Sequence, residues 1–171
     1  MSGILEEGVI FREVQRLRQP WVLAIVFGIT LATWAMAFYQ LVLGVPVGNN
    51  PAEDWLMVVI LLLVGVLFPA FILSVRLIVE VRRDGLFLRY RPFHHRFVDL
   101  KLETVVSVQA LTYRPLRDFG GWGIRYGRGG TAYSMSGKEG VQLTYPKNRH
   151  IMIGSLRAQE LEMAIRSAMR K

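Results

Sequence analysis

The chain has 171 residues, of which 52% are hydrophobic, and a formal net charge of +8. It contains no cysteine, which excludes disulfides and thiolate chemistry. After its long apolar runs, from residue 76 onward, about 95 residues remain, which is enough for one compact domain and too few for several.

Residues 1–20 form a predicted amphipathic juxtamembrane segment that contains a short helix over 4–19. Apolar residues recur there at the helical spacing i, i+4 and i+7, at Ile10, Val14 and Leu17. Two interpretations remain open for this helix: it binds the membrane interface, or it packs on the following domain or a partner. Its balanced charges favour packing, because membrane-binding helices are usually rich in Lys and Arg.

Two apolar runs without a charged residue follow, over 21–43 and 56–75. Each is long enough to cross a bilayer core of roughly 30 Å as an α-helix. Glycines and prolines between them predict a loop, so residues 21–75 are a predicted transmembrane helical hairpin. A cleavable signal peptide is the alternative for the first run, but both the run and its charged leader are too long for one.

The flanking charges predict the orientation of this hairpin. Arginines precede the first span and follow the second, whereas the loop carries only the acidic Glu53 and Asp54. The positive-inside rule then places both termini in the cytoplasm. Trp21 and Trp55 begin the two runs and are predicted anchors at the membrane interfaces.

Small residues in the spans predict close helix packing. Ala24, Gly28 and Ala32 repeat every four residues in the first span. Gly65 and Ala70 form a looser counterpart in the second span. Such a ridge lets another backbone approach closely. The favoured partner of the ridge is the other helix of the hairpin, and an interface with a second chain is the alternative.

From residue 76 onward the helical periodicity gives way to strand-like alternation. Residues 76–171 carry 18 Lys and Arg against 8 Asp and Glu, a net charge of +10. Alternation over 86–91, 103–113, 141–145 and 149–153, with a turn at Asp84-Gly85, predicts about seven strands in a small antiparallel β-barrel or sandwich. A C-terminal helix is predicted to cover one end of this fold through an apolar stripe at Leu161, Ala164, Ile165 and Ala168. Ser155 is the predicted N-cap residue of this helix.

The element order and several segments resemble an uncharacterised prokaryotic membrane-protein family with a transmembrane hairpin and a bacterial PH-like domain. The matching segments are Phe11–Arg16, Gly121–Arg125, Gly140-Val141, Ile153–Ser155, Glu160-Leu161 and Ala164-Ile165. The resemblance implies a multi-pass protein of the cytoplasmic (inner) membrane whose residues 76–171 are a cytoplasmic PH-like domain. It supplies no activity and no catalytic residues.

No motif predicts a catalytic residue, a cofactor or a metal site. The segment 127–132 fits the G-x-G-x-x-A form of a dinucleotide loop, but the residues after it have a strand pattern, so a hairpin turn is favoured. His94, His95 and His150 lack the spacing of metal ligands. An enzyme is therefore not predicted.

Two regions are candidate contact sites. Cations and aromatic rings interleave over 89–97, and a glycine-rich stretch over 114–123 holds Phe119, predicted to be exposed, and Trp122, predicted to be buried. Near lipid, an acidic partner or phosphate headgroups are more suitable ligands than nucleic acid, and a charged, solvated strand edge is the alternative. The candidate contacts are Arg89, Arg91, Phe93, Arg96, Phe119 and Arg125.

These features together predict a non-catalytic, membrane-anchored, PH-like interaction module. Its most concrete version is an accessory or scaffolding subunit that docks to a larger membrane protein complex. The alternatives are a module that binds anionic lipid at the membrane surface, and an enzyme subunit whose site forms with a partner.

Overall fold

The computed structural model describes residues 8–127 and 130–170, and the chain divides into two compact units. A helical unit extends from Arg18 to Ser74. A β-rich unit is built from the chain up to Leu17 and from Val75 onward. In the sequence, the helical unit is therefore an insertion into the β-rich unit.

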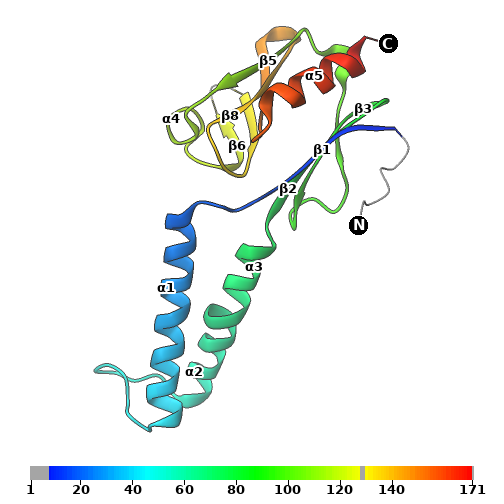
Figure 1. Ribbon diagram of the computed structural model, residues 1–171. Helices are drawn as coiled ribbons and strands as arrows, with labels where there is room; N and C mark the ends of the chain where they lie inside the picture. The colour runs from blue at the N-terminus through cyan, green and yellow to red at the C-terminus, as the bar shows by residue number, and fades with distance from the viewer. Residues whose placement is uncertain (1–7, 128–129, 171) are drawn as a thin grey trace. The chain divides into compact units, whose positions relative to one another are not determined.

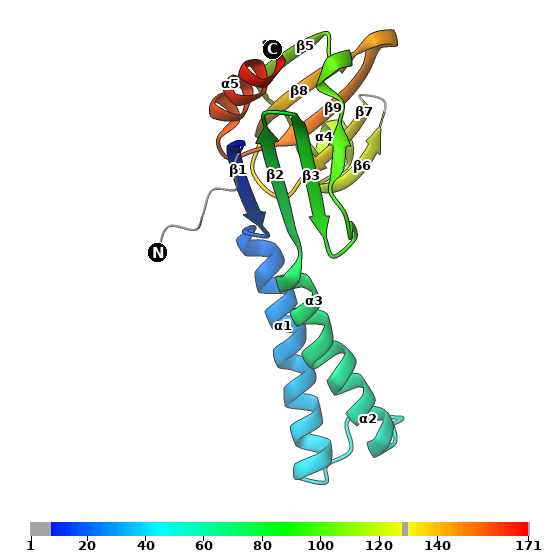
Figure 2. The same ribbon diagram turned by 90° about the vertical axis from the view of Figure 1, so that its right-hand side faces the viewer.

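The helical unit is a hairpin whose two arms lie side by side (Figures 1 and 2). Helix α1 (Pro20–Ala37) continues into the π-helical segment η1 (Phe38–Val42). The second arm consists of α2 (Asp54–Ile60), the π-helical segment η2 (Leu61–Leu67) and α3 (Phe68–Ser74). The arms span 23 and 21 residues with mean hydropathies of 2.0 and 3.1, so both are long and apolar enough to cross a membrane.

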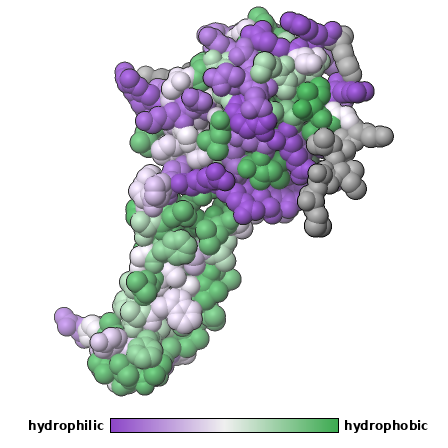
Figure 3. Space-filling view, viewed as in Figure 1, coloured by the Kyte–Doolittle hydropathy of each residue, from purple (hydrophilic) through white to green (hydrophobic). Residues whose placement is uncertain are grey.

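The two arms pack through one narrow face and leave most of their apolar side chains exposed. The buried positions of the first arm are Val26, Thr33, Ala37 and Gln40, a spacing of seven, four and three that keeps them on one side of a helix. Only 17% of each apolar segment is buried. The surface of the hairpin is accordingly mostly hydrophobic (Figure 3).

A hydrogen bond between the arms explains the position of Gly65. Pro69, four residues after Gly65, has no N–H to donate to the Gly65 carbonyl. The indole Nε1 of Trp34 donates to this carbonyl instead, at 3.1 Å. A Cβ atom on Gly65 would lie 3.2 Å from the same Nε1 atom, so glycine permits the approach.

The strands of the β-rich unit form two sheets among the described residues. The first sheet has the order β1 (Val9–Arg16), β2 (Arg76–Arg82), β3 (Gly85–Arg91) and β4 (Val98–Leu100), with every pair antiparallel. The second has the order β5-β8-β9-β7-β6, and its strands are β5 (Ser107–Thr112), β6 (Gly123–Gly127), β7 (Gly130–Ser134), β8 (Glu139–Tyr145) and β9 (Arg149–Gly154). Its β7–β9 pair is parallel.

Both sheets and the last helix, α5 (Ala158–Met169), share one hydrophobic core. Two 3₁₀ turns (Leu102–Thr104 and Pro146–Asn148) and the short helix α4 (Pro115–Phe119) complete the unit. The fully buried core side chains include Leu77, Val79, Leu88, Leu143, Ile153, Leu161 and Ile165. Burying one such side chain stabilises a fold by about 1.5–3 kcal/mol, and the predicted apolar stripe of the last helix is confirmed.

The structure corrects several of the predictions. Residues Val9–Arg16 are a strand and not a helix, whereas residues 4–7 lie outside the described chain. Residues 8–127 and 130–170 contain nine strands in two sheets that form no closed barrel, with one parallel pair, in place of the predicted antiparallel barrel or sandwich of about seven strands. The strand predicted from residue 103 begins only at Ser107. Ser155 does not cap α5, which begins at Ala158 with Arg157 at the cap position.

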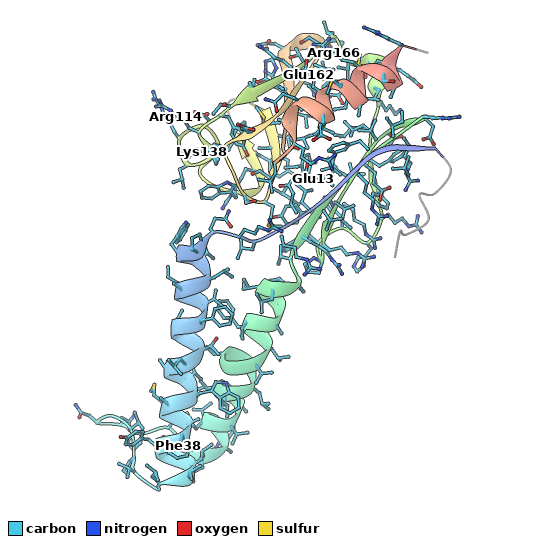
Figure 4. All side chains as sticks on the ribbon, in the orientation of Figure 1. Glu13, Phe38, Arg114, Lys138, Glu162 and Arg166 are labelled. Atoms are coloured by element: carbon cyan, nitrogen blue, oxygen red, sulfur yellow. The ribbon has the colours of Figure 1, made fainter. Side chains whose placement is uncertain are left out.

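Strand β1 is attached to the end of β9 by buried polar groups. The Glu13 carboxylate, labelled in Figure 4, accepts hydrogen bonds from Ser155 Oγ at 2.5 Å and from the Leu156 N–H at 2.9 Å. Gln15 Nε2 donates to the Gly154 carbonyl at 2.7 Å. These contacts join residues about 140 positions apart, and they explain why polar side chains point inward from β1.

Candidate functional site

The face of the first sheet that points away from the shared core carries arginines on β1, β2 and β3. A groove with a volume of about 260 Å³ runs over this face. Its lining consists of five arginines, one acid and two apolar residues: Arg12, Arg76, Ile78, Glu80, Arg82, Arg89, Arg91 and Phe97. The excess of positive charge makes the groove a candidate site for an anion.

Three of these arginines already have partners within the chain. Glu80 is only 2% exposed, and its carboxylate contacts Arg82 Nη2 at 2.6 Å and Arg12 Nε at 3.3 Å. The guanidinium groups of Arg82 and Arg89 stack over the Phe97 ring, at 5.4 and 5.7 Å from its centroid. Arg89 Nε also donates to the His94 carbonyl at 3.2 Å. These three side chains are therefore held in place.

A row of three arginines lies at the end of the same face. Arg76 on β2 is the register partner of both Arg16 on β1 and Arg91 on β3. Directly opposite residues share one face of a sheet, with Cα atoms about 4.5–5.5 Å apart. The Nε atoms of Arg76 and Arg91 are buried and have no hydrogen-bond partner among the described residues. Like charges placed directly opposite destabilise a sheet, so this row is an unfavourable arrangement in the chain by itself.

The predicted contact residues fall on both sheets. Arg89 and Arg91 line the groove, and the exposed Phe93 and Arg96 follow in the loop after β3. Arg125, on β6 of the second sheet, is exposed, and its Nε atom donates to the Trp122 carbonyl at 3.1 Å. The predicted exposure of Phe119 is wrong, because this half-buried ring packs edge-on against Tyr113 with centroids 6.0 Å apart, whereas its role as a contact residue stays a prediction. A short helix, α4, turns the side chain inward.

Trp122 is half-buried and not a core residue. Its indole Nε1 donates to the Gly137 carbonyl at 2.9 Å, which ties the loop before β6 to the turn between β7 and β8.

Burial raises the pKa of Tyr90 to about 12, against the opposing charge of Arg125. Tyr90 therefore stays protonated at neutral pH and donates to the Ser134 carbonyl at 3.4 Å. Trp122 and Tyr90 therefore each donate a hydrogen bond to a backbone carbonyl of the same domain.

His94 and His150 contact other residues of the β-rich unit, and the glycine-rich segment lies between two paired strands. His94 Nδ1 accepts a hydrogen bond from the Tyr90 N–H at 3.4 Å, and His150 Nδ1 lies 3.1 Å from Gln142 Nε2. The described residues contain no group of three or more His, Cys, Asp or Glu that could hold a metal ion. The segment 127–132 connects β6 to β7, which pair as an antiparallel hairpin, although residues 128–129 lie outside the described chain.

The small residues of the hairpin divide between its two faces. Ala24, Gly28 and Ala32 are exposed, and a Cβ atom on Gly28 would meet nothing within 4 Å. The favoured prediction, packing of this ridge within the hairpin, is therefore wrong, because the buried positions of α1 lie on its opposite side. Gly65 does pack within the hairpin, whereas Ala70 is exposed, as are Trp21 and Trp55.

Sequence reasoning missed the arginine row. From the sequence, Arg16 and Arg76 are only charges that orient the hairpin, because they lie 60 positions apart, one before the hairpin and one after it. Only the β1–β2 register brings them together. No local signal in Phe11–Arg16 indicates this pairing, because the inward positions of the strand include the polar Glu13 and Gln15 and the outward positions include Val14.

Comparison with known proteins gives one result. No curated protein and no solved structure is significantly similar to the chain. Residues 3–171 match a family of unknown function, DUF6141, which spans both the helical and the β-rich unit. The chain therefore belongs to the DUF6141 family.

Proposed function

We propose that this protein is a non-catalytic interaction module anchored in the cytoplasmic membrane by its helical hairpin. The observation that carries the proposal is the exposure of apolar side chains on the surface of the hairpin. Only 17% of each apolar segment is buried. Exposed apolar surface of this extent is unfavourable in water and favourable in lipid. The positive-inside rule supports a cytoplasmic β-rich unit, since the loop between the arms carries no Lys or Arg.

The β-rich unit is, in this proposal, a PH-like domain. Two sheets that enclose one core, followed by a single amphipathic helix, support that assignment. Because β1 precedes the hairpin and β2 follows it, the domain is interrupted by its own membrane anchor.

The biochemical role we propose is that of an accessory subunit of a larger membrane protein complex. The ridge of Ala24, Gly28 and Ala32 supports this role, because it is exposed on the side of α1 opposite to the hairpin contact. Ridges of small residues let transmembrane helices approach closely and pack. The partner in this proposal is a transmembrane helix of the complex.

Affinity purification from native membranes in mild detergent tests this role. Wild-type protein should retain a stoichiometric membrane protein partner, and Gly28→Leu should lose most of it because the side chain fills the ridge. Ile29→Phe also adds bulk, but at an exposed position about a quarter-turn away, and should retain the partner. Recovery of wild-type protein without a partner, or equal loss in both variants, would contradict the proposal.

Binding of anionic lipid by the β-rich unit is the second candidate function. The arginine row on the first sheet favours it, because its charges have no acidic partner among the described residues. Each Lys or Arg near an anionic membrane surface contributes about 1 kcal/mol to attraction. This candidate is compatible with the accessory role, since the two use different surfaces.

A further inference from the structure

We propose that Arg16, Arg76 and Arg91 together form a binding site for one phosphate group. The three residues are aligned across β1, β2 and β3 by the register of the sheet. They differ from Arg12, Arg82 and Arg89 on the same face, whose side chains are held by Glu80, Phe97 and the His94 carbonyl. The row is thus the part of the face that can still accept an anion.

The chemistry of the row matches phosphate. A guanidinium group presents its N–H donors as a planar fork that fits two phosphate oxygens, and such charge-assisted bonds are stronger than neutral ones. The buried Nε atoms of Arg76 and Arg91 each lack an acceptor in the part of the chain that the structure describes. Arg76 and Arg91 line the groove of about 260 Å³, and Arg16 is placed beside Arg76 by the strand register. This volume lies just below the usual range for drug-sized ligands, so the groove suits a small polar group.

Within residues 8–127 and 130–170, no acid forms an ion pair with the row. Glu80 is the acid that lines the groove, and it lies four residues along β2 from Arg76, or about 13 Å in an extended strand. Its carboxylate is already shared between Arg82 and Arg12. Repulsion among three aligned cations therefore remains until an anion binds, and this repulsion increases the affinity for a phosphate dianion.

A membrane lipid is the favoured source of the phosphate, and this part of the inference rests on the proposed membrane anchoring. Arg76 follows the last residue of α3, Ser74, by two positions, and Arg16 precedes the first residue of α1, Pro20, by four. An extended chain covers at most about 3.6 Å per residue, so Arg76 lies within about 7 Å of the end of its helix. If these helices end at the membrane surface, the chain length alone keeps Arg76 and Arg16 near the lipid headgroups.

Calorimetric titration of the full chain in a neutral detergent tests the site. The probes are dihexanoyl phosphatidic acid and inorganic phosphate, each titrated into wild-type protein, into Arg76→Gln/Arg91→Gln, and into Arg83→Gln/Arg117→Gln. The last variant also loses two positive charges, but at exposed positions outside the row. We expect one phosphatidic acid per wild-type chain, at least tenfold weaker binding by the first variant, and less than a twofold change in the control.

The outcomes separate the possible explanations. Equal weakening in both variants would show attraction by net charge alone, and absence of binding of either probe to wild type would remove the site. Equal affinity for both probes would retain the phosphate site but overturn the lipid as its source. Because the titration is done in detergent, its result does not depend on whether the hairpin spans a bilayer.

Thermal unfolding without ligand gives a second readout of the same proposal. Arg91→Gln should unfold at the wild-type temperature or above it, because it relieves repulsion within the row. Added phosphatidic acid should raise the unfolding temperature of wild type more than that of the variant. A variant that unfolds well below wild type would assign the row a structural role and contradict the proposal.

Discussion

Glu13 and Ser155 show how two individual residues determine the position of a strand. The Glu13 carboxylate is 8% exposed and accepts from both the Ser155 hydroxyl and the Leu156 N–H. Ser155 Oγ in turn accepts a hydrogen bond from the Arg157 N–H at 3.0 Å, just before α5 begins. One buried pair therefore joins β1 to the entrance of the last helix.

Ser155→Ala should destabilise the β-rich unit. The substitution leaves one oxygen of a buried carboxylate without its donor, and lost hydrogen bonds to charged groups cost about 1.5–3 kcal/mol. Thermal unfolding of the detergent-solubilised chain measures the effect. Ser107→Ala is the matched control, because Ser107 is exposed on β5, and it should unfold like wild type. Equal unfolding temperatures for both variants would show that the Glu13 contact adds nothing to stability.

At the scale of elements, β1 and α5 show what the sequence could and could not predict. The apolar stripe of α5 follows a helical period and was predictable, whereas β1 places Glu13 and Gln15 inside and Ile10 and Val14 outside. This inversion gives the exposed apolar residues a helical spacing. It is stable only because the partners of the inward polar groups, Gly154 and Ser155, lie at the far end of the chain. Local periodicity contains no information about such partners.

Helix α5 also covers the edge of the second sheet. Glu162 and Arg166, labelled on α5 in Figure 4, bind the free backbone groups of the edge strand β5. The Ala110 N–H donates to Glu162 Oε2 at 2.9 Å, and Arg166 Nη2 donates to the Val108 carbonyl. Covering an edge in this way prevents pairing with another strand.

The Glu162 contact predicts a response to acid. The hydrogen bond from the Ala110 N–H, and after it the contact with Arg166, holds the pKa of Glu162 below its ordinary value of 4.5. Because the pKa is lower in the folded state, this stabilisation is present above pH 4.5 and is lost as the pH falls through the folded value. The hydrogen-exchange protection factor of the Ala110 amide should therefore decrease on acidification. In Glu162→Gln the side-chain amide oxygen can still accept this hydrogen bond but does not titrate, so the protection factor should change little with pH, and a strongly pH-dependent value in that variant would contradict the assignment.

Close approach of β8 and β9 predicts a second effect at this scale. A Cβ atom on Gly140 would lie 2.5 Å from the Ile153 carbonyl oxygen, which belongs to the backbone and cannot rotate away. Gly140→Ala should thus strain the sheet and lower the unfolding temperature by several degrees. At Gly127, also in a strand, the nearest atoms would lie at 3.5 and 3.7 Å, so Gly127→Ala should be tolerated. Similar unfolding temperatures for the two variants would mean that the strands separate easily.

At the scale of the whole molecule, the chain order conceals how its parts belong together. The two apolar arms were predictable from length and hydropathy, because these properties are local. That β1 pairs with β2 across the hairpin was not, since 59 residues separate Arg16 from Arg76. The arginine row depends on the same pairing. Arg91 was therefore predicted only as a separate contact residue, and Arg16 and Arg76 only as charges that flank the hairpin.

Single-cysteine labelling tests the membrane arrangement directly. Because the sequence has no cysteine, Asn49→Cys in the loop and Lys147→Cys between β8 and β9 each introduce one thiol. If both arms span the membrane with the β-rich unit inside, a membrane-impermeant maleimide should label position 49 in intact spheroplasts and position 147 only after permeabilisation. Asn148→Cys should behave like Lys147→Cys, which controls for local accessibility. A two-span hairpin must expose its loop on the side of the membrane opposite to its ends. Labelling of both positions from the outside, or of neither position before permeabilisation, would therefore mean that the hairpin does not cross the bilayer in this orientation.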